Sequence, residues 1–131
     1  MSTVEYPEVP GLYKSPAFSH VAVIPPSASL VWVGGQNGVG SDGKVVPGGM
    51  AAQAQKVKEN LEAALAAAGC GWADVVRVQV FLKQGEDVRA GYGAFQAVFA
   101  GRKPPLVTAA LVASLANPEF LLEVSAEAVK P

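Results

Sequence analysis

Only one acidic side chain of this sequence combines a reactive type with a suggestive position. Glu123 lies between Leu122 and Val124, within an apolar run near the end of the chain. A carboxylate held in such surroundings could pass protons to or from a bound water. It could equally face solvent or form an ion pair across a subunit joint, as Glu127 on the same strand face could. Considered from these residues alone, the structural role is favoured.

The other candidates for chemistry are single residues. The chain has one histidine, His20, and one cysteine, Cys70, so a two-histidine metal site and a cluster of metal ligands are excluded. A Ser–His–Asp arrangement is allowed by counting, but no segment resembles a nucleophile elbow. We interpret His20 as structural and Cys70 as a small buried packing residue. The lone cysteine also rules out an internal disulfide and fits a reducing compartment.

A glycine-rich segment, residues 38–43, matches the pattern G-x-G-x-x-G. A dinucleotide site needs such a loop to open directly into a helix whose N-terminus meets the pyrophosphate. Here residues 44–49 intervene before any helix can begin. Asp42-Gly43 instead fits a hairpin, because both residues tolerate a positive φ.

The composition bounds the kind of protein. A length of 131 residues fits a single domain, residues 1–131, with residues 1–16 as an N-terminal tail that packs on it. Half of the residues are hydrophobic and only 16% are charged, against about 25% in typical domains, so we expect a homo-oligomer. The net charge of −1 without a basic run argues against nucleic-acid binding. We expect neither a signal peptide nor a membrane span, and hence a cytoplasmic protein.

Hydrophobic periodicity predicts the elements that position these residues. Apolar residues recur with helical spacing over residues 50–68 and 88–100, and with the alternation of a strand over residues 74–83 and 120–129. Further strands are predicted over residues 18–24, 30–34 and 106–112, with a short return strand over residues 44–46. This order favours one β-sheet covered on one face by two helices, an α+β architecture. The other sheet face mixes polar and apolar residues and suits solvent or a subunit interface.

Four segments, taken in order and spacing, resemble the RidA/YjgF family, which is also described as endoribonuclease L-PSP-like. They are residues 30–36 (LVWVGGQ), 53–69, 72–82 (WADVVRVQVFL), and 103–108 (KPPLVT) leading to 120–128 (FLLEVSAEA). The similarity covers nearly all of the chain after Pro16. It implies a chorismate-mutase-like α+β fold with one mixed sheet, and a homotrimer whose sheets pack into a central barrel. Three clefts between subunits would then bind a small molecule, with no metal and no organic cofactor.

The resemblance also assigns residues. Active members hydrolyse reactive enamines and imines, using an arginine that grips the substrate carboxylate and a glutamate beside a bound water. The glutamate matches Glu123, and a glycine that lines the cleft matches Gly35 to within one position. An aromatic residue, often tyrosine, matches Phe18, whose hydroxyl is absent. The arginine is expected two residues after Pro104, where this sequence has Leu106, so we expect weak or no activity on 2-aminoacrylate.

The resemblance and this departure leave three candidate functions. The first is hydrolysis of an imine or enamine with a non-standard, less anionic substrate, in a pocket lined by Phe18 and Leu106–Thr108 (including Val107), with Glu123 ordering the water. The second is a non-catalytic trimer that binds a small metabolite. The third, endoribonuclease action, is disfavoured, because the sequence lacks a basic face and a second histidine.

Overall fold

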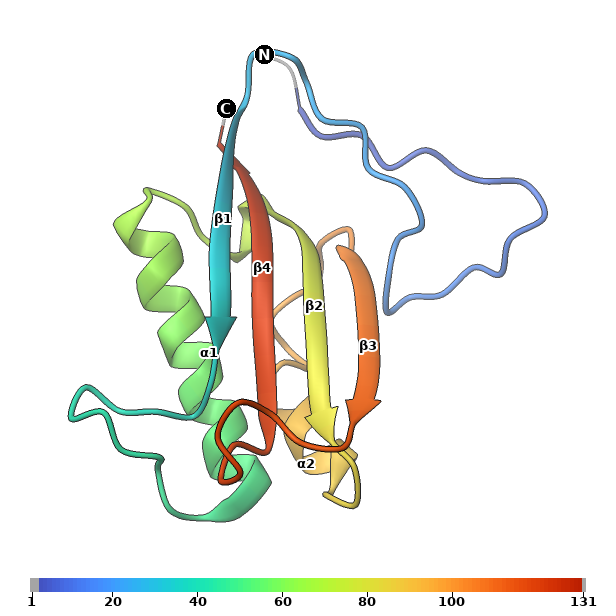
Figure 1. The fold of residues 1–131 in the computed structure, drawn as a ribbon. Helices are drawn as coiled ribbons and strands as arrows, with labels where there is room; N and C mark the ends of the chain where they lie inside the picture. Colours follow the sequence, from blue (N-terminus) through green and yellow to red (C-terminus); the bar gives the residue numbers. More distant parts are fainter. Residues whose placement is uncertain (1–2, 131) are drawn as a thin grey trace.

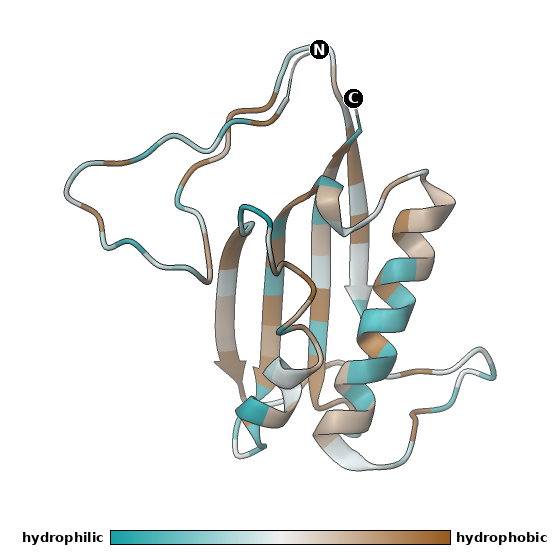
Figure 2. Cartoon of the chain, turned by 180° about the vertical axis from the view of Figure 1, so that it is seen from behind, coloured by the Kyte–Doolittle hydropathy of each residue, from teal (hydrophilic) through white to brown (hydrophobic). Residues whose placement is uncertain are grey.

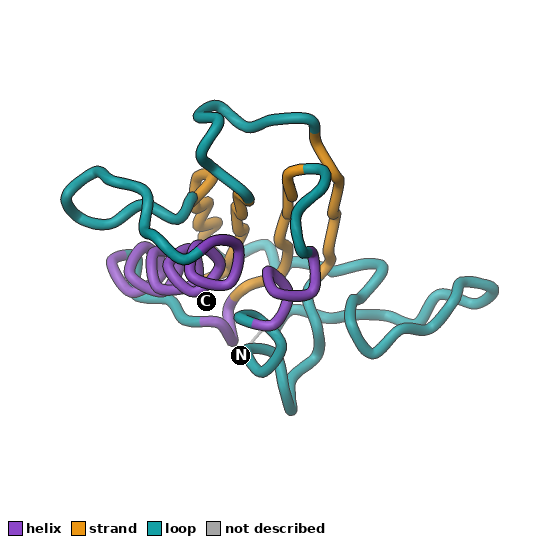
Figure 3. Tube along the Cα trace, turned by 90° about the horizontal axis from the view of Figure 1, so that it is seen from below, coloured by secondary structure: helices purple, strands orange, loops and turns teal. Residues whose placement is uncertain are grey.

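The computed structural model describes residues 3–130, which form a four-stranded mixed β-sheet with two helices on one face (Figures 1 and 3). In chain order the elements are β1 (Ser29–Gln36), α1 (Gly49–Ala67), the 3-10 turn η1 (Trp72–Asp74), β2 (Val75–Lys83), α2 (Val88–Gly93), β3 (Leu106–Val112) and β4 (Leu122–Lys130). The strands lie in the order β1-β4-β2-β3. The predicted α+β architecture, one mixed sheet covered on one face by two helices, is confirmed.

The strand directions follow from the connections. β2 and β3 run parallel, because the chain returns across the helix face through α2 before β3 begins. β4 lies between β1 and β2 and runs antiparallel to both. β1 and β3 are therefore the two edges of the sheet.

The core lies between the sheet and α1, where the predicted apolar stripe is buried. Val57 and Leu61 are fully buried and Leu65 is nearly so, and each such side chain contributes about 1.5–3 kcal/mol through burial. The helix begins one residue earlier than predicted, after Gly48. It ends at Ala67, and Gly69 follows with a φ of 76°, a left-handed conformation that favours glycine.

Hydrophilic and hydrophobic residues alternate along much of the sheet (Figure 2). Because successive side chains of a strand point to opposite sides, this alternation separates an inner face, toward the helices, from an outer face. On β2 the inner residues Val78 and Leu82 join the buried core, as the period of two predicts. The register shifts between Val75 and Arg77. This bulge places Val75 in the core cluster, where strict alternation back from Val78 would place Val76.

The strand predicted over residues 18–24 is wrong. Only Val23 pairs there, through an isolated bridge to Glu5, and the N-terminal segment extends beyond the β3 edge of the sheet (Figure 1). Prolines at positions 7, 10, 16, 25 and 26 lack the N–H that a strand ladder needs, so the segment cannot sustain regular pairing. The return strand expected at residues 44–46 is likewise reduced to one bridge, between Val45 and Val39.

The second predicted helix is shorter than expected, ending at residue 93 instead of residue 100. Asp87 caps its start by accepting hydrogen bonds from the N–H groups of residues 89 and 90. Gly91 and Gly93 lower the helical propensity, and the chain continues through turns. Phe95 and Phe99 nevertheless pack edge-on against Trp72, with ring centroids 6.2 and 5.7 Å away. Among residues 3–130, no helix has the length and apolar character needed to cross a membrane.

Candidate functional site

Glu123 lies on the outer face of the sheet, near the start of the central strand β4. Its neighbours Leu122 and Val124 point inward and are only 1% and 2% exposed, so Glu123 must point the other way. It sits opposite Phe81 of β2 in the register, and its side chain is half-buried. Ser125 and Glu127 follow at every second residue and point outward in the same way, so β4 presents a row of polar side chains on the outer face of the sheet.

The carboxylate of Glu123 is held by the end of β1. The side-chain amide of Asn37 donates hydrogen bonds to the carbonyl of Leu122 at 3.0 Å and to Oε1 of Glu123 at 3.4 Å. Gly35 leaves the space that the carboxylate occupies, since a Cβ built on it would lie 2.6 Å from Oε2 of Glu123. The structure therefore brings together two of the residues predicted to form the site.

A second asparagine keeps this arrangement in place. Asn60 of α1 donates from its side-chain amide to the carbonyls of Asn37 and Val39, at 3.1 and 3.0 Å. These hydrogen bonds fasten the loop after β1 to α1. They therefore fix the position of Asn37, the residue that donates to Glu123. Sequence reasoning missed both asparagines. The available signal was a polar residue, Asn60, directly beside the buried Leu61 on the helix.

The segment Leu106–Thr108 divides between the two faces of the sheet. Leu106 lies opposite Arg77 and Thr108 opposite Gln79, both on the outer face, whereas Val107 lies opposite Val78 on the inner face. Leu106 and Val107 therefore do not line one common space within a single chain. Arg77, the residue of β2 that lies opposite Leu106, forms an ion pair with Glu127, with Nη1 3.2 Å from Oε1.

Phe18 lies in the N-terminal segment, close to the start of β3. Its neighbour Ser19 bonds to both prolines before the strand: its N–H donates to the carbonyl of Pro105 at 3.0 Å, and its hydroxyl donates to that of Pro104 at 2.6 Å. The ring of Phe18 meets that of His20 edge-on, with centroids 5.4 Å apart. His20 in turn bonds through Nε2 to a backbone carbonyl, consistent with the structural role expected for it.

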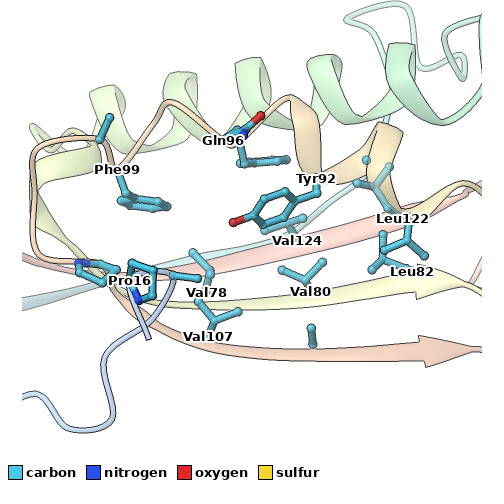
Figure 4. Close-up of a pocket in the computed structure, with 17 residues that line it drawn as sticks. Pro16, Val78, Val80, Leu82, Tyr92, Gln96, Phe99, Val107, Leu122 and Val124 are labelled. Atoms are coloured by element: carbon cyan, nitrogen blue, oxygen red, sulfur yellow. The ribbon is translucent and has the colours of Figure 1, made fainter. Parts of the chain in front are cut away.

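An apolar cavity of about 350 Å³ lies between the inner face of the sheet and the segment 88–100 (Figure 4). We call it the apolar cavity. Its lining residues are Pro16, Ala17, Val78, Val80, Leu82, Val88, Gly91, Tyr92, Phe95, Gln96, Phe99, Ala100, Pro104, Val107, Ala109, Leu122 and Val124. None of these side chains is charged. Val107 is the one predicted site residue that lines it.

A more open depression of about 390 Å³ lies between the end of β1, the loop that follows it, and α1. Gly35, Asn37, Lys56 and Asn60 are among the residues that line it. Within residues 3–130, no group of three or more His, Cys, Asp or Glu side chains is placed to hold a metal ion. Cys70 is a half-buried free thiol packed against the core.

The fold and the held carboxylate define a class of protein, the chorismate-mutase-like α+β proteins of the Rid type. The structure of the Rid protein YyfB from Yersinia pestis superposes with a TM-score of 0.81 and 30% identity, covering 95% of this chain and 97% of that one. The YjgF gene product of E. coli superposes with a TM-score of 0.69 and 30% identity, covering 78% and 81% of the two chains.

The sequence comparisons identify the family. The family model described as Endoribonuclease L-PSP matches residues 12–130, so this chain belongs to the RidA/YjgF family that this model describes. The RutC family protein UK114 of Drosophila melanogaster is 46% identical over 70 residues, 53% of this chain and 51% of that protein. The 2-iminobutanoate/2-iminopropanoate deaminase of Rattus norvegicus is 36% identical over 75 residues, 56% and 55% of the two. These matches span about half the length of each relative.

Proposed function

We propose that this chain forms a homotrimer and hydrolyses an imine or enamine that carries no carboxylate, in clefts between its subunits. The observation that carries the proposal is the held carboxylate of Glu123. Asn37 and Gly35 fix its position, as expected of a group prepared for proton transfer. The family membership supplies the reaction class, since a relative in the rat is named an imine deaminase.

In the proposed reaction Glu123 only transfers protons. Water adds to the carbon of the C=N bond, the C–N bond of the resulting carbinolamine breaks, and a carbonyl compound and ammonia leave. During the addition the carboxylate takes one proton from the attacking water and delivers it to the nitrogen, and during the collapse it takes the hydroxyl proton of the carbinolamine and delivers it to the departing nitrogen. Both protons of the water thus end on ammonia, and the carboxylate is regenerated. Correct placement of such a group typically contributes 10²–10⁴-fold to the rate.

The charges around the site support a substrate without a carboxylate. The apolar cavity has no charged side chain in its lining, and Leu106–Thr108 supply no cation. Arg77, which lies beside Leu106, is paired with Glu127, and Lys56, in the depression that Gly35 lines, is paired with Glu59. Burying an unpaired carboxylate costs far more than burying an apolar group, so a neutral substrate fits better than an amino-acid derivative.

A trimer would unite the two halves of such a site. Glu123 lies on the outer face and the apolar cavity on the inner face of the same sheet, so a cleft that contains both requires a second copy of the chain. Leu30 and Trp32 also lie on the outer face of β1 and are 61% and 74% exposed, and exposed aromatic residues are enriched at protein interfaces. Sedimentation equilibrium tests this step, with an expected mass of three times the 13.4 kDa chain.

Paired imine substrates test the reaction. A flavin-dependent amine oxidase acting on benzylamine supplies a carboxylate-free imine, and an amino-acid oxidase acting on leucine supplies a carboxylated one. We expect this protein to accelerate ammonia release from the first and not from the second. The opposite preference would contradict the proposed substrate class.

Restoring an arginine adds a gain-of-function test. Leu106→Arg would place the charge on the outer face, and Val107→Arg would direct it into the apolar cavity. One of these variants is expected to gain at least tenfold in use of the carboxylated imine, because a charge-assisted hydrogen bond contributes about 1.5–3 kcal/mol. The variant that gains identifies which face meets the substrate.

A non-catalytic binding protein is the second candidate. It is favoured by the separation of the apolar cavity from Glu123 within the chain, since the cavity alone is large enough to hold a small molecule. A ligand that binds the cavity and is recovered unchanged, together with no acceleration of any imine, would favour this function.

A further inference from the structure

The apolar cavity contains very little polar chemistry. Of its lining residues, only Tyr92 and Gln96 have side chains with polar atoms. The amide of Gln96 lies on the side away from the strands, whereas the ring of Tyr92 lies over them and directs its oxygen into the cavity (Figure 4). Tyr92 thus presents the one side-chain hydrogen-bonding group aimed into this space among the residues that line it.

The hydroxyl of Tyr92 is free to bind a ligand. The side chain is 59% exposed, and within residues 3–130 no hydrogen bond joins its oxygen to another residue. Without a ligand, water can satisfy this group. A ligand that fills the cavity displaces that water and must supply a hydrogen-bond acceptor in its place, because leaving the hydroxyl unpaired makes the binding free energy less favourable. Sites with such a group reject analogues that lack the matching atom.

We propose that Tyr92 is the specificity-determining residue of the apolar cavity, selecting a neutral, mostly apolar molecule with one acceptor, a carbonyl or imine, that accepts a hydrogen bond from Oη. This inference rests on the proposed function only in taking the cavity as part of the substrate cleft. It goes beyond that function by naming the group that holds the substrate in place of a cation. A phenyl or alicyclic ketone or imine has the right character.

The walls support an apolar ligand body of this kind. Val78, Val80 and Val107 form the floor on the strands, and Phe95 and Phe99 form part of the opposite wall. Pro16 and Ala17 close one end, and the hydrogen bonds of Ser19 to the carbonyls before β3 hold that part of the N-terminal segment in place. Such surroundings favour a flat hydrocarbon group and supply no counter-charge for an anion.

Three probes of nearly equal shape test the selection. Acetophenone carries the acceptor, α-methylstyrene replaces its oxygen with a CH₂ group, and benzoate replaces the acetyl group with a carboxylate. Affinities are measured by NMR titration of the uniformly ¹⁵N-labelled full chain, following amide signals of β2, β3 and residues 88–100. One hydrogen bond corresponds to roughly a five- to tenfold preference for acetophenone over α-methylstyrene, and we expect benzoate to bind at least tenfold more weakly than acetophenone.

The variants assign the preference to one oxygen atom. Tyr92→Phe removes only the hydroxyl and is expected to bring the ratio of the two neutral affinities to about one. Tyr13→Phe, at a position that is 75% exposed and outside the cavity, is the matched control and should keep the wild-type ratio. Loss of folding would not change the ratio selectively, so the ratio separates a binding role from a structural one.

Several outcomes would overturn the inference. Equal affinities for the two neutral probes in the wild type, an unchanged preference in Tyr92→Phe, tighter binding of benzoate, or no binding of either neutral probe would each do so. The test is separable from that of the proposed function, because acetophenone is bound without being hydrolysed. Selective ketone binding without imine hydrolysis would contradict the proposed function alone. Imine hydrolysis without a Tyr92-dependent preference for the ketone would contradict this inference alone.

Discussion

Replacing Gly35 with alanine tests the contact that positions the proposed catalytic carboxylate. An added Cβ would lie 2.6 Å from Oε2 and 2.7 Å from Cδ of Glu123, closer than real Cβ atoms tolerate, and a tight 3.0 Å from Cγ. The φ of Gly35 is outside the left-handed region, so the effect arises from the contact and not from backbone strain. The side chain of Glu123 must therefore move.

The neighbouring glycine supplies a matched control. A Cβ at Gly34 meets no atom within 4 Å, so Gly34→Ala should stabilise the strand by roughly 0.4–1 kcal/mol. Gly35→Ala gains the same entropic benefit, but forces Glu123 off its rotamer, at about 0.5–1.5 kcal/mol. It also strains the hydrogen bond from Asn37, which contributes about 0.5–1.5 kcal/mol when well formed. We expect Gly35→Ala to be about 1–2 kcal/mol less stable than Gly34→Ala.

Urea unfolding at one fixed protein concentration, followed by tryptophan fluorescence, measures this difference, and the fixed concentration removes any effect of subunit association. The double variant Gly35→Ala with Glu123→Ala completes a cycle, and removal of the carboxylate should recover most of the loss. Equal free energies of unfolding for Gly34→Ala and Gly35→Ala, or a loss that persists without Glu123, would refute the packing of the carboxylate against Gly35.

Three further predictions concern other contacts. Leu61→Ala, at a fully buried position, should lower the free energy of unfolding by about 2–5 kcal/mol, whereas Glu62→Ala on the exposed side should change it by less than about 0.5 kcal/mol; urea titration compares the two. Asn60→Ala leaves two loop carbonyls without their donor and should cost about 1–3 kcal/mol, and a cost no larger than that of Glu62→Ala would contradict these bonds. The hydrogen bond from Lys14, together with its charge, lowers the pKa of Glu8. The stability that this pair contributes is therefore present above the usual glutamate pKa and is lost as the pH falls through the lowered pKa. NMR titration of Glu8 in Lys14→Met should show the pKa of Glu8 rising toward its ordinary value, and an unchanged pKa would disprove the pairing.

Much of the fold could be predicted from the sequence because long apolar patterns decide it. The helix over residues 50–68 and the strand over residues 106–112 were predicted to within one residue. The helix buries a continuous apolar face, whereas the strand is largely exposed in this chain and was found from the apolar run that begins after Pro105. The segments 18–24 and 88–100 were predicted as more regular than they are. Prolines on both sides of the first segment (Pro16, Pro25 and Pro26) and glycines within the second (Gly91 and Gly93) weaken regular backbone hydrogen bonding. Hydrophobic spacing alone does not show this effect.

The site was less accessible from the sequence. The match of Glu123 and Gly35 to a family pattern placed them in one site, and the structure brings them into contact. Asn37 and Asn60 could not be found in this way, because their role depends on a loop whose path is set by tertiary hydrogen bonds. The division of Leu106 and Val107 between opposite faces required the exact strand register, and a shift of one residue exchanges the two faces.

The most direct test of the proposed function is ammonia release from the carboxylate-free imine of benzylamine, comparing the wild type with Glu123→Gln and Glu127→Gln. Glu127 lies on the same face of β4, four pairs further along the register with β2, and serves as the matched control. We expect Glu123→Gln to lose at least 10²-fold in rate and Glu127→Gln to stay within a few-fold of the wild type. Equal rates in the wild type and Glu123→Gln would contradict the assignment of Glu123 as the proton-transfer group.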